Sequence, residues 1–417
     1  MQTNLADFIK GTRDGKEAEA ILRKCVHCGF CTATCPTYQL LGDELDGPRG
    51  RIYLIKQVLE GQKATAKTQT HLDRCLTCRN CESTCPSGVE YGRLVDIGRK
   101  IVGEQVARSG TDKFKRTLLA KGLNSPLFAP AMALGQAMRW AVPGALKAKV
   151  PPKQEAALLA KARPAPRHRR KMLLLEGCVQ NAMLPNINNA AARVLDHLGV
   201  SLVSAPKAGC CGALNYHLDF QEAGLDNMRR NIDAWWPMIE AGQVEALAMT
   251  ASGCGVMVKE YGHLLADDPA YAVRAARVSE MTRDLSELVI EEPTLPAALL
   301  RAGGAAQSKK IAYHPPCTLQ HGQQIRGHAE KLLTDAGFTL MPVAESHLCC
   351  GSAGAYSVLH PEIAGELKMR KLSHLEAGKP DLICSANVGC LTHLQSGTQT
   401  PVRHWVEVID EVIAGSA

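Results

Sequence analysis

Two copies of one cysteine pattern stand near the N-terminus. Each copy has four cysteines at intervals of three, three and four residues, and a proline follows the last one, at Pro36 and at Pro86. Closely spaced thiolates let one loop surround most of an iron–sulfur cubane, and the fourth cysteine of such a run usually ligates the other cluster. We therefore expect two [4Fe–4S] clusters with crossed ligand sets, Cys25, Cys28, Cys31 and Cys85 for the first and Cys75, Cys78, Cys81 and Cys35 for the second.

Zinc is the alternative metal for these motifs, because a C-x2-C pair by itself often binds Zn²⁺. A zinc site needs neither the third cysteine nor the proline, yet both occur in each copy. The pattern therefore favours iron–sulfur clusters over zinc knuckles.

A second set of cysteines belongs to a repeat in the C-terminal part of the chain. Each copy is predicted to be a β-α-β-α-β unit, with strands at 172–175, 200–203 and 246–249 in the first and at 310–313, 338–341 and 381–384 in the second. One cysteine follows the first strand, a Cys-Cys-Gly sequence follows the second, and one cysteine follows the third. The first cysteine and the pair are 32 positions apart in both copies, from Cys178 to Cys210 and from Cys317 to Cys349.

Helical crossovers between these strands imply parallel sheets, whose strands end at one edge. We therefore expect two sites, one formed by Cys178, Cys210, Cys211 and Cys254, and the other by Cys317, Cys349, Cys350 and Cys390. Several of these residues precede predicted helices, whose N-termini stabilise thiolates. The glycine after each pair would let the backbone approach a ligand closely.

Several interpretations of the repeat cysteines stay open. Free cysteine is often only a small buried residue, and a disulfide or a zinc site would also use such pairs. A further iron–sulfur centre is the interpretation that we favour. His314 and His347 stand near these cysteines, and for both we expect ordinary hydrogen-bonded side chains rather than ligands. Cys384 has no counterpart in the first unit and is predicted to be a strand residue.

The remaining chain must position these thiols. Residues 1–110 are predicted to be a helical module, with apolar residues at helical spacing over 52–59 and 94–102. Within it, the stretch from Asp46 to Gly50 is predicted to be a turn and helix start, with a cluster contact by Arg49 or Arg51 as the alternative. Residues 111–171 are rich in Pro, Ala and basic residues and are predicted to be a connector with one or two short helices. It could rest on a membrane or a partner subunit, although we favour a linker packed on its own domains.

The repeat units are assigned to 172–300 and 301–417. The predicted fold class is therefore a multidomain α+β protein, with an N-terminal α-helical ferredoxin module followed by two pseudo-repeated α/β units with parallel sheets.

The composition of the chain limits the classes of function that we expect for it. The chain has 417 residues, 46% of them apolar, with 17 cysteines and a net charge of +7. It opens without the features of a secretory signal, so we expect a reducing, cytoplasmic compartment, in which cysteines favour metals over disulfides. No apolar run is long enough to span a bilayer. The aromatic content of 4% argues against a platform for stacking nucleic-acid bases.

Two cofactor motifs are missing. The sequence has neither G-x-G-x-x-G after a strand nor G-x4-G-K-[ST]. Clusters without a hydride carrier suit the transfer of single electrons, so we expect FAD only on partner flavoprotein subunits.

The cysteine patterns resemble those of a known family. Twin C-x2-C-x2-C-x3-C-P motifs followed by two Cys-Cys-Gly units resemble the iron–sulfur subunits of glycolate oxidase. Two segments also resemble that family, namely K-C-V-H-C-G-F-C-T-A-T-C-P-T-Y from Lys24 and D-G-P-R-G-R from Asp46. This resemblance implies an electron-transfer subunit of a glycolate dehydrogenase complex, in which flavin subunits oxidise glycolate to glyoxylate. A quinone or another membrane acceptor would receive the electrons, with the complex peripheral on the cytoplasmic face of the inner membrane.

Related families give the alternative functions. The equivalent subunits of lactate and anaerobic glycerol-3-phosphate dehydrogenases share the pattern, as do the catalytic subunits of heterodisulfide reductase, which would imply thiol–disulfide chemistry. The heterodisulfide reductase units end in C-x2-C, whereas Ala251 and Asn387 stand at the first of these positions here. The absence of a fifth cysteine argues against that chemistry and against a full non-cubane cluster. A zinc-stabilised binding protein is the third alternative, against which the Pro-terminated quartets argue.

Overall fold

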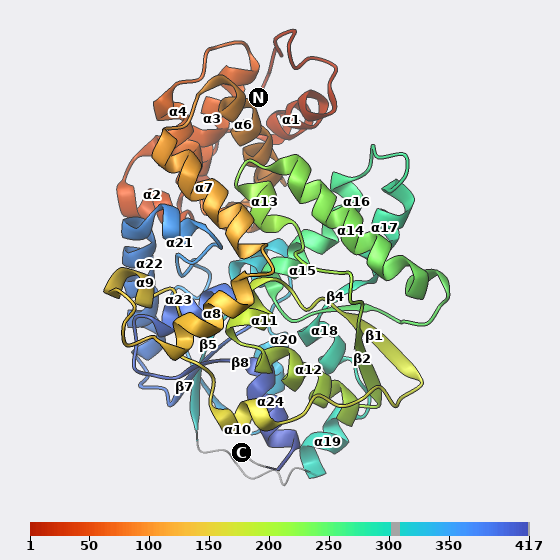
Figure 1. Ribbon diagram of the computed structural model, residues 1–417. Coiled ribbons are helices and arrows are strands. Elements are labelled where there is room, and N and C mark those ends of the chain that lie inside the picture. The colour runs from red at the N-terminus through yellow and green to blue at the C-terminus, as the bar shows by residue number, and fades with distance from the viewer. Residues whose placement is uncertain (302–308, 416–417) are drawn as a thin grey trace.

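The computed structural model describes residues 1–301 and 309–415. Figure 1 shows a helical module at the top and two sheet-containing units below it, with helix α7 running from the module onto the units. A helical module followed by two units with parallel sheets is the fold class that the sequence predicts, and the structure confirms it. The domain boundaries predicted from the sequence stay predictions.

The N-terminal module is a bundle of four longer helices with short helical turns between them. The longer helices are α1 (Arg13–Lys24), α3 (Pro48–Leu59), α4 (Ala66–Asp73) and α6 (Tyr91–Gln105); the short ones are η1 (Phe30–Thr32), α2 (Pro36–Leu41), η2 (Glu44–Asp46) and α5 (Asn80–Thr84). Leu22, Ile55, Leu59 and Leu94 form a shared apolar core. Pro48 occupies the first turn of α3, where a missing N–H costs no hydrogen bond, so the expected helix start is confirmed.

The connector has more helix than the sequence suggests. It contains α7 (Gly110–Leu123), α8 (Phe128–Ala137), α9 (Gly144–Lys147) and α10 (Ala156–Ala160), so the expectation of one or two short helices is wrong. Pro130 lies in the first turn of α8, where proline is tolerated, and it therefore does not break the helix. Arg170, assigned to the connector, already belongs to the first strand.

The first α/β unit is a four-stranded parallel sheet in the order β2-β1-β3-β4. Its strands are β1 (Arg170–Leu174), β2 (Val200–Ser204), β3 (Leu247–Met249) and β4 (Thr282–Asp284). Its helices are α11 (Val179–Met183), α12 (Asn186–His197), α13 (Ala213–His217), α14 (Gln221–Glu240), α15 (Ser252–Lys259), α16 (Tyr261–Leu264), α17 (Ala272–Met281), α18 (Leu285–Ile290) and α19 (Leu295–Arg301).

The second unit repeats this topology in the order β6-β5-β7-β8, again fully parallel. Its strands are β5 (Lys310–His314), β6 (Thr339–Met341), β7 (Leu382–Ser385) and β8 (Val402–His404). Its helices are η3 (Thr318–Gly322), α20 (His328–Asp335), α21 (Tyr356–Leu359), α22 (Pro361–Glu376), α23 (Val388–Gln395) and α24 (Trp405–Ile413).

The two units pack against each other through one continuous apolar core. Leu195 on α12 and Trp405 on α24 both belong to it and are fully buried. Close to this core the imidazole of His404 is 3.0 Å from the carbonyl oxygen of Thr250. The carboxyl edges of the two sheets also meet, since Gly253 donates its backbone N–H to the side-chain oxygen of Asn387 at 3.2 Å.

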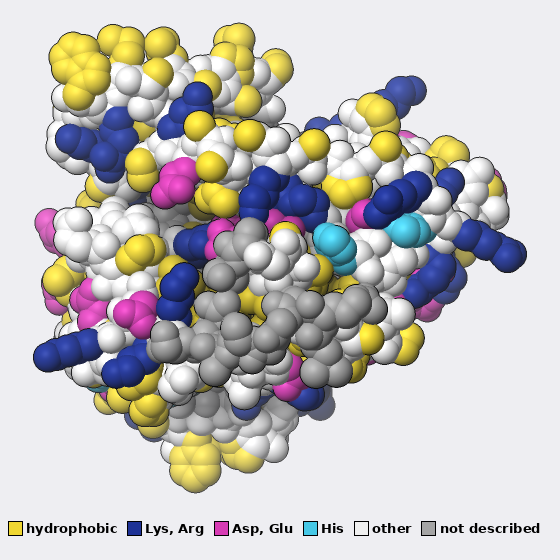
Figure 2. All heavy atoms as spheres, turned by 90° about the horizontal axis from the view of Figure 1, so that it is seen from below, with side chains coloured by type: hydrophobic (Ala, Val, Ile, Leu, Met, Phe, Trp, Pro, Cys, Tyr) yellow, Lys and Arg dark blue, Asp and Glu magenta, His cyan; other side chains and the backbone are white. Residues whose placement is uncertain are grey.

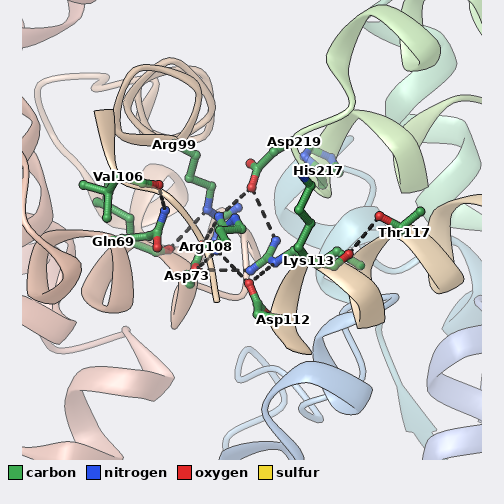
Figure 3. A network of polar contacts seen from close by, with 12 residues as sticks. Gln69, Asp73, Arg99, Val106, Arg108, Asp112, Lys113, Thr117, His217 and Asp219 are labelled. Carbon is green, nitrogen blue, oxygen red and sulfur yellow. Dashed lines mark hydrogen bonds and ion pairs between the residues drawn. The ribbon is translucent and has the colours of Figure 1, made fainter. Parts of the chain in front are cut away.

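A charged network ties the module and α7 to the first unit. Arg108 contacts Asp73 at 2.6 Å and Asp219 at 2.5 Å, and Arg116 contacts Asp73 at 3.1 Å and Asp112 at 3.0 Å (Figure 3). Asp73 ends α4 and Asp219 follows α13, so the arginines bridge segments that lie far apart in the sequence. Among the described residues, none of the helices combines the length and apolar composition needed to cross a bilayer.

Candidate metal centres

The first cysteine loop begins where α1 ends and closes on the last cysteine of the second loop. Burial raises the pKa of Cys31 to about 11, with contributions in the same direction from the neighbouring thiols of Cys25, Cys85 and Cys28. All four cysteines line one small cavity of about 30 Å³. The structure thus brings together the four residues expected around the first cluster, and Cys28 is the exposed member of the group.

The second loop repeats the backbone conformation of the first. His27 and Gly29 have φ angles of 57° and 87°, and the equivalent Thr77 and Arg79 have angles of 53° and 58°. Left-handed angles at residues other than glycine are uncommon and persist where the surrounding structure imposes them. In the second loop the N–H of Thr77 points at the sulfur of Cys75, at 3.3 Å. Such N–H···S contacts are among the factors that tune iron–sulfur sites.

The second group of four thiols also forms across the two loops. Burial raises the pKa of Cys81 well above its ordinary value, and the nearby thiols of Cys78, Cys75 and Cys35 act in the same direction. Thr34 and Thr84 connect the loops through their hydroxyl oxygens, 3.0 Å apart. The donor set and the interlocked loops fit two clusters with crossed ligands.

Two buried arginines surround the second group. Arg51 is 1% exposed and donates to the hydroxyl of Thr37 at 3.1 Å, and that hydroxyl lies 3.3 Å from the sulfur of Cys35. Arg99 donates to the carbonyl oxygen of Cys75 at 2.7 Å. Arg49 instead pairs with Glu44 at 2.6 Å and is partly exposed. Sequence reasoning named Arg51 only as an alternative and did not find Arg99, because a basic residue on an apolar helix carries no distinctive local signal.

The positive charge of Arg51 has an acidic counterpart. Asp46 is fully buried and its carboxylate contacts Arg51 at 3.4 Å, Arg74 at 2.8 Å and His71 at 3.0 Å. This buried cluster fixes the position of α3 relative to the second loop. The D-G-P-R-G-R segment is therefore structural and also places a cation beside Cys35.

The four cysteines of the first Cys-Cys-Gly unit lie in one chain of contacts. The thiols of Cys178 and Cys211 lie beside Cys210 and lower its pKa to about 3, and the thiol of Cys254 lies beside Cys211. The N–H of Gly212 points at the sulfur of Cys210 at 3.5 Å.

The second unit repeats this arrangement and extends it. Cys349 contacts Cys317 and Cys350, and Cys350 contacts Cys390. The N–H of Gly351 points at the sulfur of Cys349 at 3.4 Å. The side chain of Lys371 is 2% exposed and donates to the carbonyl oxygen of Glu345 at 2.6 Å; its charge lies near the cysteines of the unit.

The glycines after the cysteine pairs have a role in packing. Gly212 and Gly351 have φ angles of 93° and 87°. A Cβ atom at Gly212 would meet the carbonyl oxygen of Gly224 at 2.7 Å, and one at Gly351 would meet that of Ala364 at 2.6 Å. Each glycine therefore permits a left-handed turn and the close approach of the following long helix.

His314 differs from the expectation. It is 1% exposed, and among the described residues neither ring nitrogen has a hydrogen-bond partner, so the prediction of an ordinary hydrogen-bonded histidine is wrong. Burial lowers its pKa well below the usual range, and the imidazole is neutral. His347 is half-buried, and its carbonyl oxygen contacts the imidazole of His321 at 2.9 Å. Cys384 pairs with Tyr313 within the sheet, which confirms it as a strand residue.

Both Cys-Cys-Gly sites open onto one cavity of about 920 Å³. Its lining includes residues of both units, of the second cysteine loop and of α7 and α8, among them Cys78, Leu118, Met132, Cys178, His314 and Cys390. The amide nitrogen of Asn387 lies 3.7 Å from the sulfur of Cys390. Sulfur donors from three parts of the chain therefore face one cavity.

Comparisons with known proteins agree with this arrangement. Residues 21–89 match a family described as a 4Fe-4S dicluster domain, and residues 172–259 and 311–395 each match a family described as a cysteine-rich domain. The first match confirms the prediction of two [4Fe–4S] clusters in the helical module.

Three relatives extend the comparison. The chain is 54% identical over 414 residues to the glycolate oxidase iron-sulfur subunit of Escherichia coli, with 99% of both chains covered. It is 30% identical over 409 residues to the probable glycolate oxidase iron-sulfur subunit of Bacillus subtilis, covering 91% of this chain and 90% of the relative. Lactate utilization protein A of an Exiguobacterium strain is 27% identical over 241 residues, which cover 56% of this chain and 94% of the relative.

Proposed function

Since this chain belongs to the family of glycolate oxidase iron–sulfur subunits, we propose that it is the electron-transfer subunit of a flavin-linked glycolate dehydrogenase complex. Its partners are flavoprotein subunits of the same complex, which carry FAD and oxidise glycolate to glyoxylate. The observation that carries this proposal is the pair of four-thiol groups in interlocked loops of one small module.

The ligand assignment follows the same groups. Cys25, Cys28, Cys31 and Cys85 hold one [4Fe–4S] cluster, and Cys75, Cys78, Cys81 and Cys35 hold the other. When bound, such clusters accept and release single electrons. The exposed thiol of Cys28, flanked by Val26 and Phe30 at 68% and 61% exposure, supports electron exchange with a partner at this end of the module. Arg51 and Arg99 stabilise negative charge at the other group.

We extend the proposal to the Cys-Cys-Gly sites, where each unit holds a further metal centre. Four thiols in contact, an N–H···S bond from the following glycine and a nearby cation occur in both units. Arg230 supplies the cation in the first unit, since it donates to the carbonyl oxygen of Cys210 at 3.0 Å. Thiolates with such compensation are the ligands that iron and zinc take from proteins.

The electron acceptor is a quinone or another membrane component, and the complex lies on the cytoplasmic face of the inner membrane. The proposed membrane location is supported by an exposed apolar surface on the connector. This surface is formed by Phe114, Leu118, Leu127, Leu134, Met138 and Trp140. Lys113, Lys115 and Lys121 are exposed on the same segment. Figure 2 shows hydrophobic side chains gathered on the projecting lobe at the upper left, on the side where α8 lies in Figure 1, with Lys and Arg side chains beside them.

Apolar groups flanked by lysines suit an anionic bilayer surface. Sedimentation with vesicles that contain phosphatidylglycerol tests this part. We expect Trp140→Ser combined with Leu134→Ser to weaken binding, whereas Val273→Ser, which changes an exposed apolar residue on α17, should not. Equal binding of all three proteins would contradict a membrane contact at the connector.

Co-purification tests the central function. The tagged chain, isolated anaerobically with its partners, should bring down a flavoprotein, and glycolate should reduce the cluster signals of this chain. Lactate and glycerol 3-phosphate are the matched substrates that should not. Reduction by lactate instead of glycolate would assign the chain to a lactate dehydrogenase, and no reduction by any of the three would contradict the proposed function.

A further inference from the structure

His314 is a buried polar side chain that lacks a polar partner within the described part of the chain. It ends strand β5 and is 1% exposed. Neither Nδ1 nor Nε2 makes a hydrogen bond, although the backbone oxygen of the same residue accepts one from the hydroxyl of Ser385 at 2.8 Å. Imidazole always offers a donor or a lone pair at each nitrogen, and buried polar groups are nearly always satisfied. The ring therefore requires a partner of another kind.

The surroundings of the ring indicate what that partner is. A ring nitrogen of His314 and the sulfur atoms of Cys350 and Cys390 all lie within 4.8 Å of one another, and all three residues are buried. They come from three different elements, namely the end of β5, the loop after β6 and the first turn of α23. The three residues also line the same cavity. A nitrogen and two sulfur atoms that converge in this way can share a single metal atom.

We propose that His314 is a nitrogen ligand to a metal atom that it shares with Cys350 and Cys390. The inference deepens the proposed function, since it rests on the metal centre assigned above to the second Cys-Cys-Gly unit. Neutral imidazole and thiolate together bind zinc in structural sites and iron in clusters with mixed ligands. Iron is the metal that the proposed electron transfer favours, and the two metals are separated by the experiment below.

The first unit supplies an internal comparison. His314 stands three residues before Cys317, and Leu175 stands three residues before Cys178. Leu175 is 4% exposed and belongs to an apolar core. The repeat therefore places a non-ligating side chain in one unit and an imidazole in the other. The two centres then differ in their donors, with four thiols in the first unit and four thiols and a nitrogen in the second.

Two nearby side chains do not fill this role. Asn387 occupies the position of the missing fifth cysteine, but its amide nitrogen points at the sulfur of Cys390 at 3.7 Å and its oxygen accepts from Gly253. His393 is also buried, but its Nε2 atom is 3.2 Å from the carbonyl oxygen of Ala364, so it has a polar partner. His393 is therefore a matched control for a buried histidine of the same unit that is not a ligand.

A nitrogen ligand has a consequence for electron transfer. Neutral imidazole adds no negative charge, and replacement of thiolate by imidazole raises the reduction potential of a cluster. The centre of the second unit should accordingly have a more positive potential than the same centre with a cysteine at position 314. This difference can be measured without turnover of the complex.

The test uses the complex purified anaerobically from cells grown with ¹⁵N-histidine. Pulsed electron paramagnetic resonance should detect a directly coordinated ¹⁵N nucleus on a paramagnetic iron centre. We expect His314→Leu, which copies the residue of the first unit, to abolish this coupling, and His393→Gln to retain it. His314→Cys keeps a ligand at the site, so it should retain the iron, lose the nitrogen coupling and shift the potential of that centre to a more negative value.

Metal analysis gives the second readout. If the second unit holds zinc, one equivalent of zinc per chain should be lost in His314→Leu and retained in His393→Gln, which also supports the proposal. A nitrogen coupling that persists in His314→Leu would overturn it, as would a chain with only eight irons and no zinc. Metal retained in full by His314→Leu, with no nitrogen coupling in the wild type, would overturn it too. Failure of the proposed function is separate, because it would appear as cluster signals that glycolate does not reduce.

Discussion

The side chain of Cys78 packs beside that of Cys317, and the two thiols are close enough to influence each other's charge. Cys78 belongs to the second cysteine loop and Cys317 to the second Cys-Cys-Gly unit, and both pack in one small apolar cluster with Leu76 and Cys349. The residues assigned to one cubane are thus in direct contact with those assigned to another metal centre. Metal centres held by neighbouring side chains interact magnetically and exchange electrons readily.

Loss of the second-unit centre should therefore change the signal of the nearer cubane. We expect Cys350→Ala to remove line broadening from the reduced cluster at Cys75, Cys78, Cys81 and Cys35, while the other cubane keeps its signal. Continuous-wave electron paramagnetic resonance of the reduced protein at low temperature measures this effect. The matched control is Cys211→Ala in the first unit, whose thiols do not contact Cys78 in the described structure. Identical spectra of wild type and Cys350→Ala would contradict a paramagnetic centre in contact with this cubane.

Arg51 should raise the potential of the same cubane. Arg51→Gln removes a buried positive charge beside Cys35, and Asp46 still keeps its contacts with Arg74 and His71. The reduced cluster carries more negative charge, so its potential should fall, on the order of 50 mV for one electron. A redox titration followed by electron paramagnetic resonance measures the shift.

The control for Arg51 is Arg49→Gln. Arg49 is partly exposed and paired with Glu44, so solvent screens its charge and the second cluster should be little affected. Equal shifts of the reduction potential in the two variants would contradict a specific effect of the buried charge of Arg51.

Much of the fold could be predicted because the C-terminal part of the chain is a repeat, and its strands and helices have strong local sequence patterns. The first three strands of each unit were found as short apolar runs. The fourth strands, Thr282–Asp284 and Val402–His404, were missed because each consists mostly of polar residues and forms no apolar run. Pairing with a neighbouring strand, which is not a local property, makes them part of the sheets.

The site was predictable to a similar degree. Cysteine spacing pointed to all sixteen thiols, since metal ligation imposes regular intervals on a sequence. The contact between Cys78 and Cys317 depends on how a module and a distant unit dock, which spacing does not encode. The isolation of the His314 ring was also hidden, because the lack of a hydrogen-bond partner is visible only in three dimensions. The contrast between Leu175 and His314 was the one signal in the sequence.

Gly351 should be intolerant of a side chain. In Gly351→Ala the left-handed backbone alone costs about 1–2 kcal/mol, and the new Cβ would lie 2.6 Å from the oxygen of Ala364. We expect a lower free energy of unfolding and loss of metal from the second unit, measured by urea unfolding and metal analysis. Gly365→Ala, next to Ala364 on α22, is the control, because no atom lies within 4 Å of its Cβ position. That change should stabilise the helix by about 0.5–1 kcal/mol, and similar losses in both variants would contradict the packing role of Gly351.

Buried His404 should make the protein sensitive to acid. Burial lowers its pKa to about 3, whereas the unfolded chain takes up the proton near pH 6.5. The unfolded state therefore binds more protons between these values, and the free energy of unfolding decreases as the pH falls below 6.5. For this one residue the loss between pH 7 and pH 5 is roughly 2 kcal/mol.

The matched variant for this prediction is His404→Asn. Asparagine is a good N-cap and can accept from Val406, as His404 does at 3.2 Å, but it does not titrate. Urea unfolding followed by circular dichroism at the two pH values should show a smaller acid loss in the variant than in the wild type. The same loss in both proteins would contradict the assignment of a neutral buried imidazole.

The metal content of the anaerobically purified chain tests the central claim most directly. Two cubanes of four irons each require about eight non-heme irons per chain, and more if a Cys-Cys-Gly site is filled with iron. Iron and zinc should be measured together with acid-labile sulfide on the same sample. At least eight irons with matching sulfide is the predicted result, whereas zinc with negligible iron would contradict the account of two electron-carrying clusters.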